Sequence, residues 1–486
     1  PEEIFDVEPH AIALTSRLIA EDDSWTLPRK FKIAFSGSNT DKGYATLADL
    51  GFIARNKDGE KGFRVYVAGG LGNKPCAGHL MFNFIPQAEV YNITKAVKNL
   101  FWKNGNRKNK HAARLRFLWE SLGEEEFKRK FNTEYEAVKK ENYPALEVKE
   151  IENTGLTPQI AILEINQRDF SLWKRRFVLP QKQESLFSVA IPIELGFITS
   201  LKAKALAEFI APFGDNVLRL TKNQNILLRN IKEKYLPCFY QFLKEHFTNF
   251  NRPLVFGSLI SCAGASTCQL GICLSRGAAK ALMQELEKSN LDLDRLAGIK
   301  INISGCPNSC GQHLAADLGF FGKVGRKAEK LYPAYNVVAA AEIVDGKTKL
   351  AKKVGEVSAR DLPMLVKEFL SLYLSKKNGD KNFSQYLKEQ GVSDLEKLCR
   401  KFQNIPQFSE DRNYYFDWGA QEVFSLSGRG SGECSAGIFD LIEVDLNNLK
   451  QTKEKISELS GEDKEKQIFL EKLVFYSCRM LLITRG

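Results

Sequence analysis

The sequence lacks several features that would each assign it to a class of protein. It has no run of about 18 apolar residues, so no membrane-spanning helix is predicted. Ten cysteines in 486 residues are far too few for a disulfide-stapled secreted domain. Cys238 and Cys478 lie in apolar runs that are typical of buried thiols, so we predict a reducing, cytoplasmic location. The glycine-rich stretch SGRGSGE (427–433) precedes no strand-turn-helix unit, and we interpret it as a loop and not as a nucleotide site.

What the sequence does contain is typical of a globular protein with more than one core. It is 43% hydrophobic and 11% aromatic, and its length favours two or three domains. The net charge of +11 favours an anionic partner or substrate, but does not choose among nucleic acid, an acidic protein and a small oxyanion. The basic stretch at 102–117 predicts a solvated helix face. The chain begins with Pro1, which is compatible with a targeting segment ahead of it.

Two distant segments match each other. Residues 32–52, KIAFSGSNTDKGYATLADLGF, align without gaps with residues 300–320, KINISGCPNSCGQHLAADLGF, and ten of the twenty-one positions are identical. Such a match indicates a duplicated unit, in which a strand is followed by an anion-sized loop and a second short element. We therefore predict two equivalent copies of one structure.

The copies differ where chemistry is expected. Cys306 aligns with Ser38 and Cys310 with Lys42, so only the second copy has thiols. The fold therefore does not need them, and we infer that they hold something bound to one copy only. Residues 188–231, ahead of the second copy, are typical of a strand, a helix over 200–212 and further strands. Because nothing comparable precedes the first copy, we expect a matching lobe to be missing on its N-terminal side.

Four cysteines form two pairs on glycine-containing loops. Cys262 and Cys268 are separated by five residues, and Cys306 and Cys310 by three. Zinc knuckles use gaps of two to four residues, whereas an iron-sulfur cluster accepts a wider spread of thiolates, so a cluster is favoured. Zinc and simple core cysteines remain alternatives. Cys273, with apolar neighbours, is interpreted as a packed helix position.

These motifs carry a resemblance to a known family. The pattern CAGASTC (262–268) followed by GCPNSCGQ (305–312), with LPRKFKIAFSG (27–37) in the first copy, resembles the siroheme-dependent nitrite and sulfite reductases over roughly residues 1–375. The resemblance implies a 4Fe-4S cluster held by Cys262, Cys268, Cys306 and Cys310. It further implies that Cys310 is shared with the siroheme iron, and that Asn308 contacts siroheme carboxylates; simple turn chemistry is an equal reading of Asn308.

Two further motifs match the family. Lys30 and Lys32 match its paired lysines that face the substrate, and alternation along a strand would place both on one side. The other interpretation of this pair is a charged strand edge. The stretch RLTKNQN resembles the family's second siroheme-binding loop, since a porphyrin with several carboxylates needs cationic and amide donors around it; its candidate residues are Arg219, Lys222, Asn223, Gln224 and Asn225.

The predicted fold class is α+β, with duplicated reductase repeats of mixed sheets flanked by helices, a ferredoxin-like half-domain and a helical C-terminal domain. The predicted divisions are a first repeat (1–150), a linker with one strand (151–185), the half-domain (186–252), the cluster and siroheme repeat (253–375) and the helical domain (376–486). The last of these faintly resembles a HEPN-like domain, to which we assign a docking or structural role.

The function implied by the resemblance is the six-electron reduction of sulfite to sulfide or of nitrite to ammonia, with sulfite slightly favoured. Without a dinucleotide site, the electrons are expected from another protein, either an acidic ferredoxin or a flavoprotein. A zinc module that binds nucleic acid and a simple electron carrier are the other readings. The cysteines lack the interleaved basic and aromatic residues that the nucleic-acid reading requires, so neither a nucleic-acid nor a membrane partner is predicted.

Overall fold

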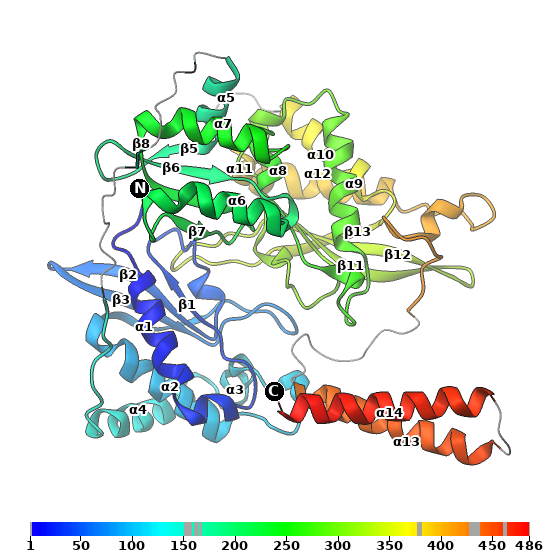
Figure 1. Cartoon of the computed structure of the whole chain (residues 1–486), viewed down its shortest axis with the longest axis horizontal. Coiled ribbons are helices and arrows are strands. Elements are labelled where there is room, and N and C mark those ends of the chain that lie inside the picture. The colour runs from blue at the N-terminus through cyan, green and yellow to red at the C-terminus, as the bar shows by residue number, and fades with distance from the viewer. Residues whose placement is uncertain are drawn as a thin grey trace. The chain divides into compact units, whose positions relative to one another are not determined.

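A computed structural model describes residues 2–149, 158–159, 165, 168–376, 382–426, 438–459 and 464–485. The chain divides into two compact units, residues 1–429 and residues 430–486. The larger unit contains three mixed or antiparallel sheets with helices packed against them, which confirms the predicted α+β class (Figure 1). Across the described residues, every helix is either too short or too polar to span a lipid bilayer.

The first sheet belongs to the first repeat. Its strands lie in the order β1-β2-β3-β4, with β1 parallel to β2 and the other pairs antiparallel. Four helices surround it, and aromatic side chains such as Phe52, Phe63 and Phe101 fill the core between them. The elements are α1 (Glu8–Ile19), β1 (Ile33–Ser36), β2 (Leu50–Lys57), β3 (Glu60–Val67), β4 (His79–Pro86), α2 (Val90–Asn104), α3 (Leu115–Leu122) and α4 (Glu124–Lys140).

The second sheet belongs to the second repeat and has one strand more. Its order is β13-β12-β11-β10-β9, with β9, β10 and β11 parallel. The elements are α8 (Leu254–Gly257), β9 (Leu259–Ser261), α9 (Ser275–Glu287), β10 (Ile301–Ser304), β11 (Leu318–Lys327), β12 (Lys330–Ala339), β13 (Lys352–Ser358), α10 (Leu362–Lys376), α11 (Phe383–Tyr386) and α12 (Val392–Lys401). Leu282, Phe369, Tyr386 and Leu395 share its core, so α11 and α12 pack with the second repeat.

The third sheet is the ferredoxin-like half-domain between the repeats, with the order β5-β6-β8-β7. Phe209 of α6 stacks on Phe242 of α7 with ring centroids 4.1 Å apart, so both helices contribute to one aromatic core. The predicted strand, helix and strand pattern over 188–231 is confirmed. The elements are α5 (Arg168–Phe177), β5 (Val178–Pro180), β6 (Leu186–Ile191), α6 (Ser200–Ile210), β7 (Leu218–Leu220), β8 (Ile226–Lys232) and α7 (Leu236–His246).

The duplication is confirmed bond by bond. Ile33 pairs with Leu50 in the first copy as Ile301 pairs with Leu318 in the second. In each copy an aspartate carboxylate accepts the amide of the lysine before the strand, at 2.8 Å: Asp49 from Lys32 and Asp317 from Lys300. In each copy, too, a serine hydroxyl accepts a loop glycine amide: Ser36 from Gly43 and Ser304 from Gly311. Residues that are identical in the two copies therefore form the hydrogen bonds that hold the loop in place.

The smaller unit is an antiparallel pair of long helices, α13 (Ile438–Glu458) and α14 (Lys464–Arg485), which contact each other along their length (Figure 1). Arg479 of α14 forms an ion pair with the fully buried carboxylate of Asp445 in α13. The helical character agrees with the prediction, while the HEPN-like resemblance and the predicted domain boundaries remain predictions. Most of the predicted linker strand at 158–165 and all of the 427–437 loop lie outside the described residues.

Candidate active site

The two cysteine loops lie at one edge of the second sheet. Cys262 directly follows β9, and Cys306 comes two residues after β10; because these strands are parallel, their C-terminal ends meet at the same edge. The amide of Cys262 donates to the carbonyl of Ile303 at 3.2 Å, and the amide of Gly305 donates to the sulfur of Cys262 at 3.1 Å. The topology thus brings the two predicted pairs together.

Gly305 is the residue through which the loops interlock. Its carbonyl accepts the amides of Ile272 and Cys273 at 2.8 and 2.9 Å. A Cβ at position 305 would lie 2.7 Å from the carbonyl oxygen of Cys273 and 2.8 Å from the Cα of Gly264, both of them backbone atoms. Only glycine therefore fits between the loops. Cys273 itself is fully buried, but it lies just before α9 and not inside a helix as predicted. Its thiol donates to carbonyls of β11 and β12.

The four candidate thiols differ in exposure and none is in a disulfide. Cys306 is buried, Cys262 and Cys268 are half-buried, and Cys310 is exposed. Among the described residues, no three Cys, His, Asp or Glu side chains are gathered closely enough to bind a single metal ion. Four thiolates on two hydrogen-bonded loops are a donor set that an iron-sulfur cluster takes, and also one that zinc takes.

His313 supports the second loop and was missed by sequence reasoning. Its Nδ1 lies 2.8 Å from the hydroxyl of Ser304, the same hydroxyl that accepts the Gly311 amide, and its ring stacks on Phe321. Burial lowers the pKa of His313 to about 3, so the imidazole is neutral. The first copy has Ala45 at this position, so the repeat gave no signal for it.

Lys30 and Lys32 are exposed and lie just before β1, which begins at Ile33. Neither lysine therefore lies within a strand, as the prediction assumed, because Asp49 accepts the Lys32 amide just ahead of β1. That their side chains stand on one side stays a prediction. Leu50 pairs with both Ile33 and Val67, so the turn that follows β3 lies at the lysine end of the sheet.

That turn contacts the second repeat. A Cβ at Gly72 would lie 3.5 Å from the carbonyl oxygen of Asn308, and Asn308 itself is half-buried between the two cysteines of its loop. The lysine end of the first copy therefore faces the cysteine loop of the second.

The RLTKNQN turn joins β7 to β8, and most of its side chains have protein partners. Arg219 forms an ion pair with Glu8 of α1 at 2.5 Å. Gln224 donates to the carbonyl of Ser261 at 2.9 Å, directly before Cys262, and Asn225 donates to the carbonyl of Gly257 at 2.7 Å. Gln224 and Asn225 therefore anchor the half-domain to the start of the cysteine loop, while Asn223 is half-buried beside them.

Lys222 points toward the first copy. Its ammonium lies 3.2 Å from the ring centroid of Tyr44, and Asp41 of the loop that aligns with the cysteine loop is among its electrostatic neighbours. Burial, reinforced by Lys300, lowers the pKa of Lys222 to about 7. Tyr44 in turn donates to the carbonyl of Ala315 at 3.3 Å, so this cluster lies where the two repeats meet.

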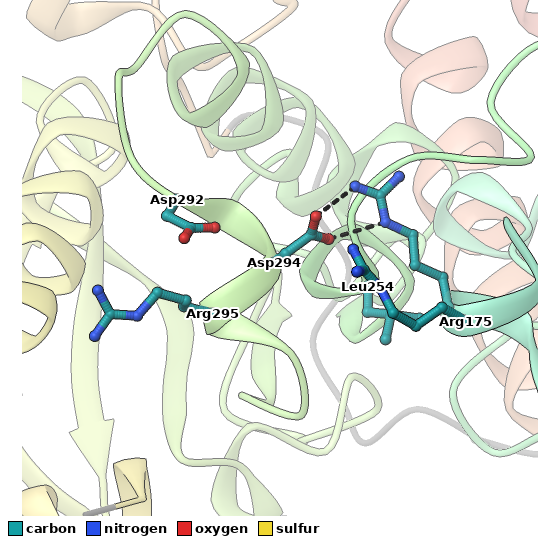
Figure 2. A pocket seen from close by; sticks show the side chains of 6 residues that line it. Arg175, Leu254, Asp292, Asp294 and Arg295 are labelled. Atoms are coloured by element: carbon teal, nitrogen blue, oxygen red, sulfur yellow. Dashed lines mark hydrogen bonds and ion pairs between the residues drawn. The ribbon is translucent and has the colours of Figure 1, made fainter. Parts of the chain in front are cut away.

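One cavity of the larger unit, of about 680 Å³, lies beside Cys268. It is lined by residues 265–269 and 422–425 and by Leu274, Asp417 and Ala420. Figure 2 shows another cavity, with Asp292, Asp294 and Arg295 among its lining residues. Its volume is about 400 Å³, and Arg176, which also lines it, forms a bidentate ion pair with Asp294 at 2.9 and 2.7 Å. None of the predicted site residues lines this second cavity.

Fold and site together define a duplicated α+β protein in which one repeat carries two hydrogen-bonded cysteine loops. Comparison with protein families extends this. A family model described as the nitrite and sulphite reductase 4Fe-4S domain matches residues 1–140 and 257–404, and one described as the nitrite/sulfite reductase ferredoxin-like half domain matches residues 179–246. Because the first match alone covers more than half of the chain, the chain belongs to the nitrite and sulphite reductase 4Fe-4S family.

Individual relatives agree with this placement. The chain is 29% identical to a ferredoxin--nitrite reductase of Synechococcus elongatus over 76% of its own length and 68% of that protein's. It is 29% identical to the chloroplastic ferredoxin--nitrite reductase of Arabidopsis thaliana over 74% and 58%. Among four such relatives the chain spans from 52% to 68% of their lengths. The solved structure of the Mycobacterium tuberculosis NirA protein shares the fold, with a TM-score of 0.67 and 24% identity over 81% of this chain and 69% of that one.

Proposed function

We propose that this chain binds a 4Fe-4S cluster through Cys262, Cys268, Cys306 and Cys310 and reduces nitrite to ammonia with six electrons. The observation that carries the proposal is the backbone-bonded pair of cysteine loops in a family whose domain is described as 4Fe-4S. Sequence reasoning put sulfite slightly first, with nitrite as the alternative. The names of the relatives favour nitrite, and also support ferredoxin as the electron donor over a flavoprotein.

A siroheme is proposed as the second cofactor, with Cys310 as the thiolate that it shares with the cluster. When bound, it supplies an iron at which the anion is reduced with electrons from the cluster. The exposure of Cys310 suits a ligand that serves a group outside its own loop. We also propose that the side-chain amide of Asn308, which is half-buried, donates to the carboxylates of the siroheme.

The role proposed for Lys30 and Lys32 is to hold the anionic substrate and to supply protons. Both are exposed at the end of the first sheet that faces the cysteine loop. Two opposite unit charges about 4 Å apart attract by roughly 4 kcal/mol at an effective dielectric constant of about 20, enough to favour an anion there over bulk water.

The RLTKNQN turn contributes less to a siroheme site than its composition implied. Arg219, Gln224 and Asn225 already bind protein partners, and Lys222 lies over Tyr44. We therefore propose that Gln224 and Asn225 act by fixing the start of the Cys262 loop. Lys222 and Asn223 remain as direct donors to a cofactor carboxylate.

Production of the chain with siroheme biosynthesis, followed by iron, zinc and acid-labile sulfide analysis and an absorption spectrum, tests the proposal. We expect iron with sulfide and a tetrapyrrole spectrum, and a higher kcat/KM for nitrite than for sulfite with reduced ferredoxin. Cys268→Ser is expected to lose the cluster, while the control Cys76→Ser, also half-buried but in the first repeat, is expected to keep it. Iron-free, colourless protein with stoichiometric zinc and salt-dependent nucleic-acid binding would refute the proposal.

A further inference from the structure

The sulfur of Cys262 has two hydrogen-bonding partners from the protein. The amide of Gly305 donates to it at 3.1 Å, and the hydroxyl of Ser275 lies 3.3 Å from it. The same hydroxyl donates to the carbonyl oxygen of Cys262 at 3.0 Å. Ser275 is completely buried and is the first residue of α9, so its oxygen has no access to water.

The position of Ser275 is fixed from two sides. A Cβ at Gly264 would lie 2.5 Å from the Ser275 hydroxyl, so glycine at 264, with φ of +63°, is what lets the hydroxyl approach the loop. On the other side, the carboxylate of Asp417 accepts the amide of Leu274 at 2.7 Å, and the carbonyl oxygen of Trp418 would lie 1.9 Å from a Cβ at Gly277. The first turn of α9 is thereby held in place.

Asp417 and Trp418 lie beyond residue 404, where the match to the 4Fe-4S domain model ends. The indole of Trp418 also donates to the carbonyl of Ala359 at 2.6 Å, which ties this segment to the second repeat. The support for Ser275 is therefore supplied partly by a segment outside the family match.

A hydrogen bond to a metal-bound thiolate changes the energy of the cluster that the thiolate holds. Reduction adds negative charge to the cluster and its sulfur ligands, so a donor bond to a sulfur is stronger in the reduced state and raises the reduction potential. The N-terminal end of α9, which carries partial positive charge, acts in the same direction. Once Cys262 is a thiolate it can only accept. The Ser275 hydroxyl has one proton, so its bond to the sulfur forms by sharing with the sulfur the proton that it also donates to the Cys262 carbonyl oxygen.

We propose that Ser275 is a positioning residue for the cluster, which raises its reduction potential by donating a hydrogen bond to the thiolate of Cys262. This inference rests on the proposed function, because it requires the cluster. With Ser275 in place, an external electron donor would reduce the cluster more easily.

The test is a potentiometric titration of the cluster, followed by its absorbance and electron paramagnetic resonance, in the holoenzyme and in three variants. At the wild-type midpoint potential, S275A is expected to lower the ratio of reduced to oxidised cluster by about three- to tenfold, where tenfold corresponds to 59 mV for a one-electron couple. S275T, which keeps the hydroxyl, is expected to stay within about twofold of the wild type. The control S266A removes a hydroxyl from the same loop that bonds the carbonyl of Ala263, so the ratio should not move.

The outcomes separate this inference from the proposed function. Wild-type protein without a cluster refutes the proposed function. A wild-type cluster whose potential is the same in S275A, with full iron content, refutes only the role of Ser275. If S275A loses iron, S275G removes the hydroxyl with more room around it, and the same shift is expected; loss of iron from both would make Ser275 purely structural and overturn the inference.

Discussion

Replacement of Gly305 by alanine tests whether the two cysteine loops must interlock as described. The added Cβ would lie 2.7 Å from the Cys273 carbonyl oxygen and 2.8 Å from the Gly264 Cα. Both are backbone atoms, which cannot move aside as the end of a flexible side chain can. Overpacking of this kind costs about 1–3 kcal/mol. The bonds from Ile272 and Cys273 to the Gly305 carbonyl, worth about 1 kcal/mol each, would also weaken. We expect the free energy of unfolding to fall by about 2–4 kcal/mol.

The duplication supplies a matched control. Gly37 aligns with Gly305, and a Cβ there would meet the side chain of Glu3 at 3.1 Å and the carbonyl oxygen of Phe5 at 3.2 Å. Because Glu3 is exposed and can move, Gly37→Ala should cost less than about 1 kcal/mol.

Urea unfolding of the apoprotein and iron content of the reconstituted protein measure the two effects. Gly305→Ala should lose both stability and iron, while Gly37→Ala should lose neither. A Gly305→Ala protein with wild-type iron content and a free energy of unfolding within about 0.5 kcal/mol of Gly37→Ala would refute the interlocking of the loops.

Three further predictions follow from the charges at the site. Replacing Lys30 and Lys32 by glutamine should raise the KM for nitrite at least tenfold while the cluster absorbance is unchanged; an unchanged KM would exclude them from the substrate site. Because burial lowers the pKa of His313 to about 3, the unfolded chain takes up a proton below about pH 6.5 that the folded chain does not. Stability therefore falls as the pH is lowered, by up to about 1.4 kcal/mol per pH unit. His313→Gln should flatten that fall between pH 7 and pH 5 in urea unfolding, and an equal slope in both proteins would contradict it. Because the pKa of Lys222 is lowered to about 7, the unfolded chain holds a proton between about pH 7 and pH 10 that the folded chain releases, so stability rises with pH there. Lys222→Met should remove that rise when unfolding is compared at pH 7 and pH 9, and a rise as steep as in the wild type would show that this lysine keeps its proton.

The duplicated fold was predictable because the repeat identities are the side chains that bind the backbone. Ser36 with Ser304, and Asp49 with Asp317, each accept the same loop or strand amide in both copies. Because each of these contacts lies within one copy, keeping the contact requires the same residue at the aligned position of both copies. The family resemblance and the ferredoxin-like half-domain, read from the same kind of local pattern, are confirmed by the family models.

The supporting contacts of the site were not predictable, because they are long-range. Asp417 accepts the amide of Leu274, just before α9, from 143 residues away, and no local sequence pattern connects the two residues. Arg219 is read from its motif as a cofactor ligand, yet Glu8 of α1 binds it. His313 is buried, and its spacing from other polar residues in the sequence gives no indication of its role. Tertiary packing determines the partners of all three residues, and local patterns in a single sequence do not predict such long-range contacts.

The first copy shows what the cysteine loop does without its thiols. Its loop has the same left-handed residues, Asp41 and Tyr44, that the second copy has at Ser309 and Gln312. Because both loops keep one backbone path, the path is dictated by the strand, serine and aspartate contacts and not by a bound group. The binding energy of a cofactor at the second loop is therefore not needed to fold it, and can instead favour particular charge states of the centre.

In the first copy the loop's polar side chains bond to one another and to the N-terminal segment. The hydroxyl of Ser38 lies 2.9 Å from that of Thr40, and Lys42 forms an exposed ion pair with Glu2 at 2.8 Å. The aligned side chains of the second copy are Cys306, Asn308 and Cys310, and Cys310 stays exposed. The first copy's loop thus bonds to the protein itself, while the second copy leaves the sulfur of Cys310 exposed, where we propose that it meets a cofactor.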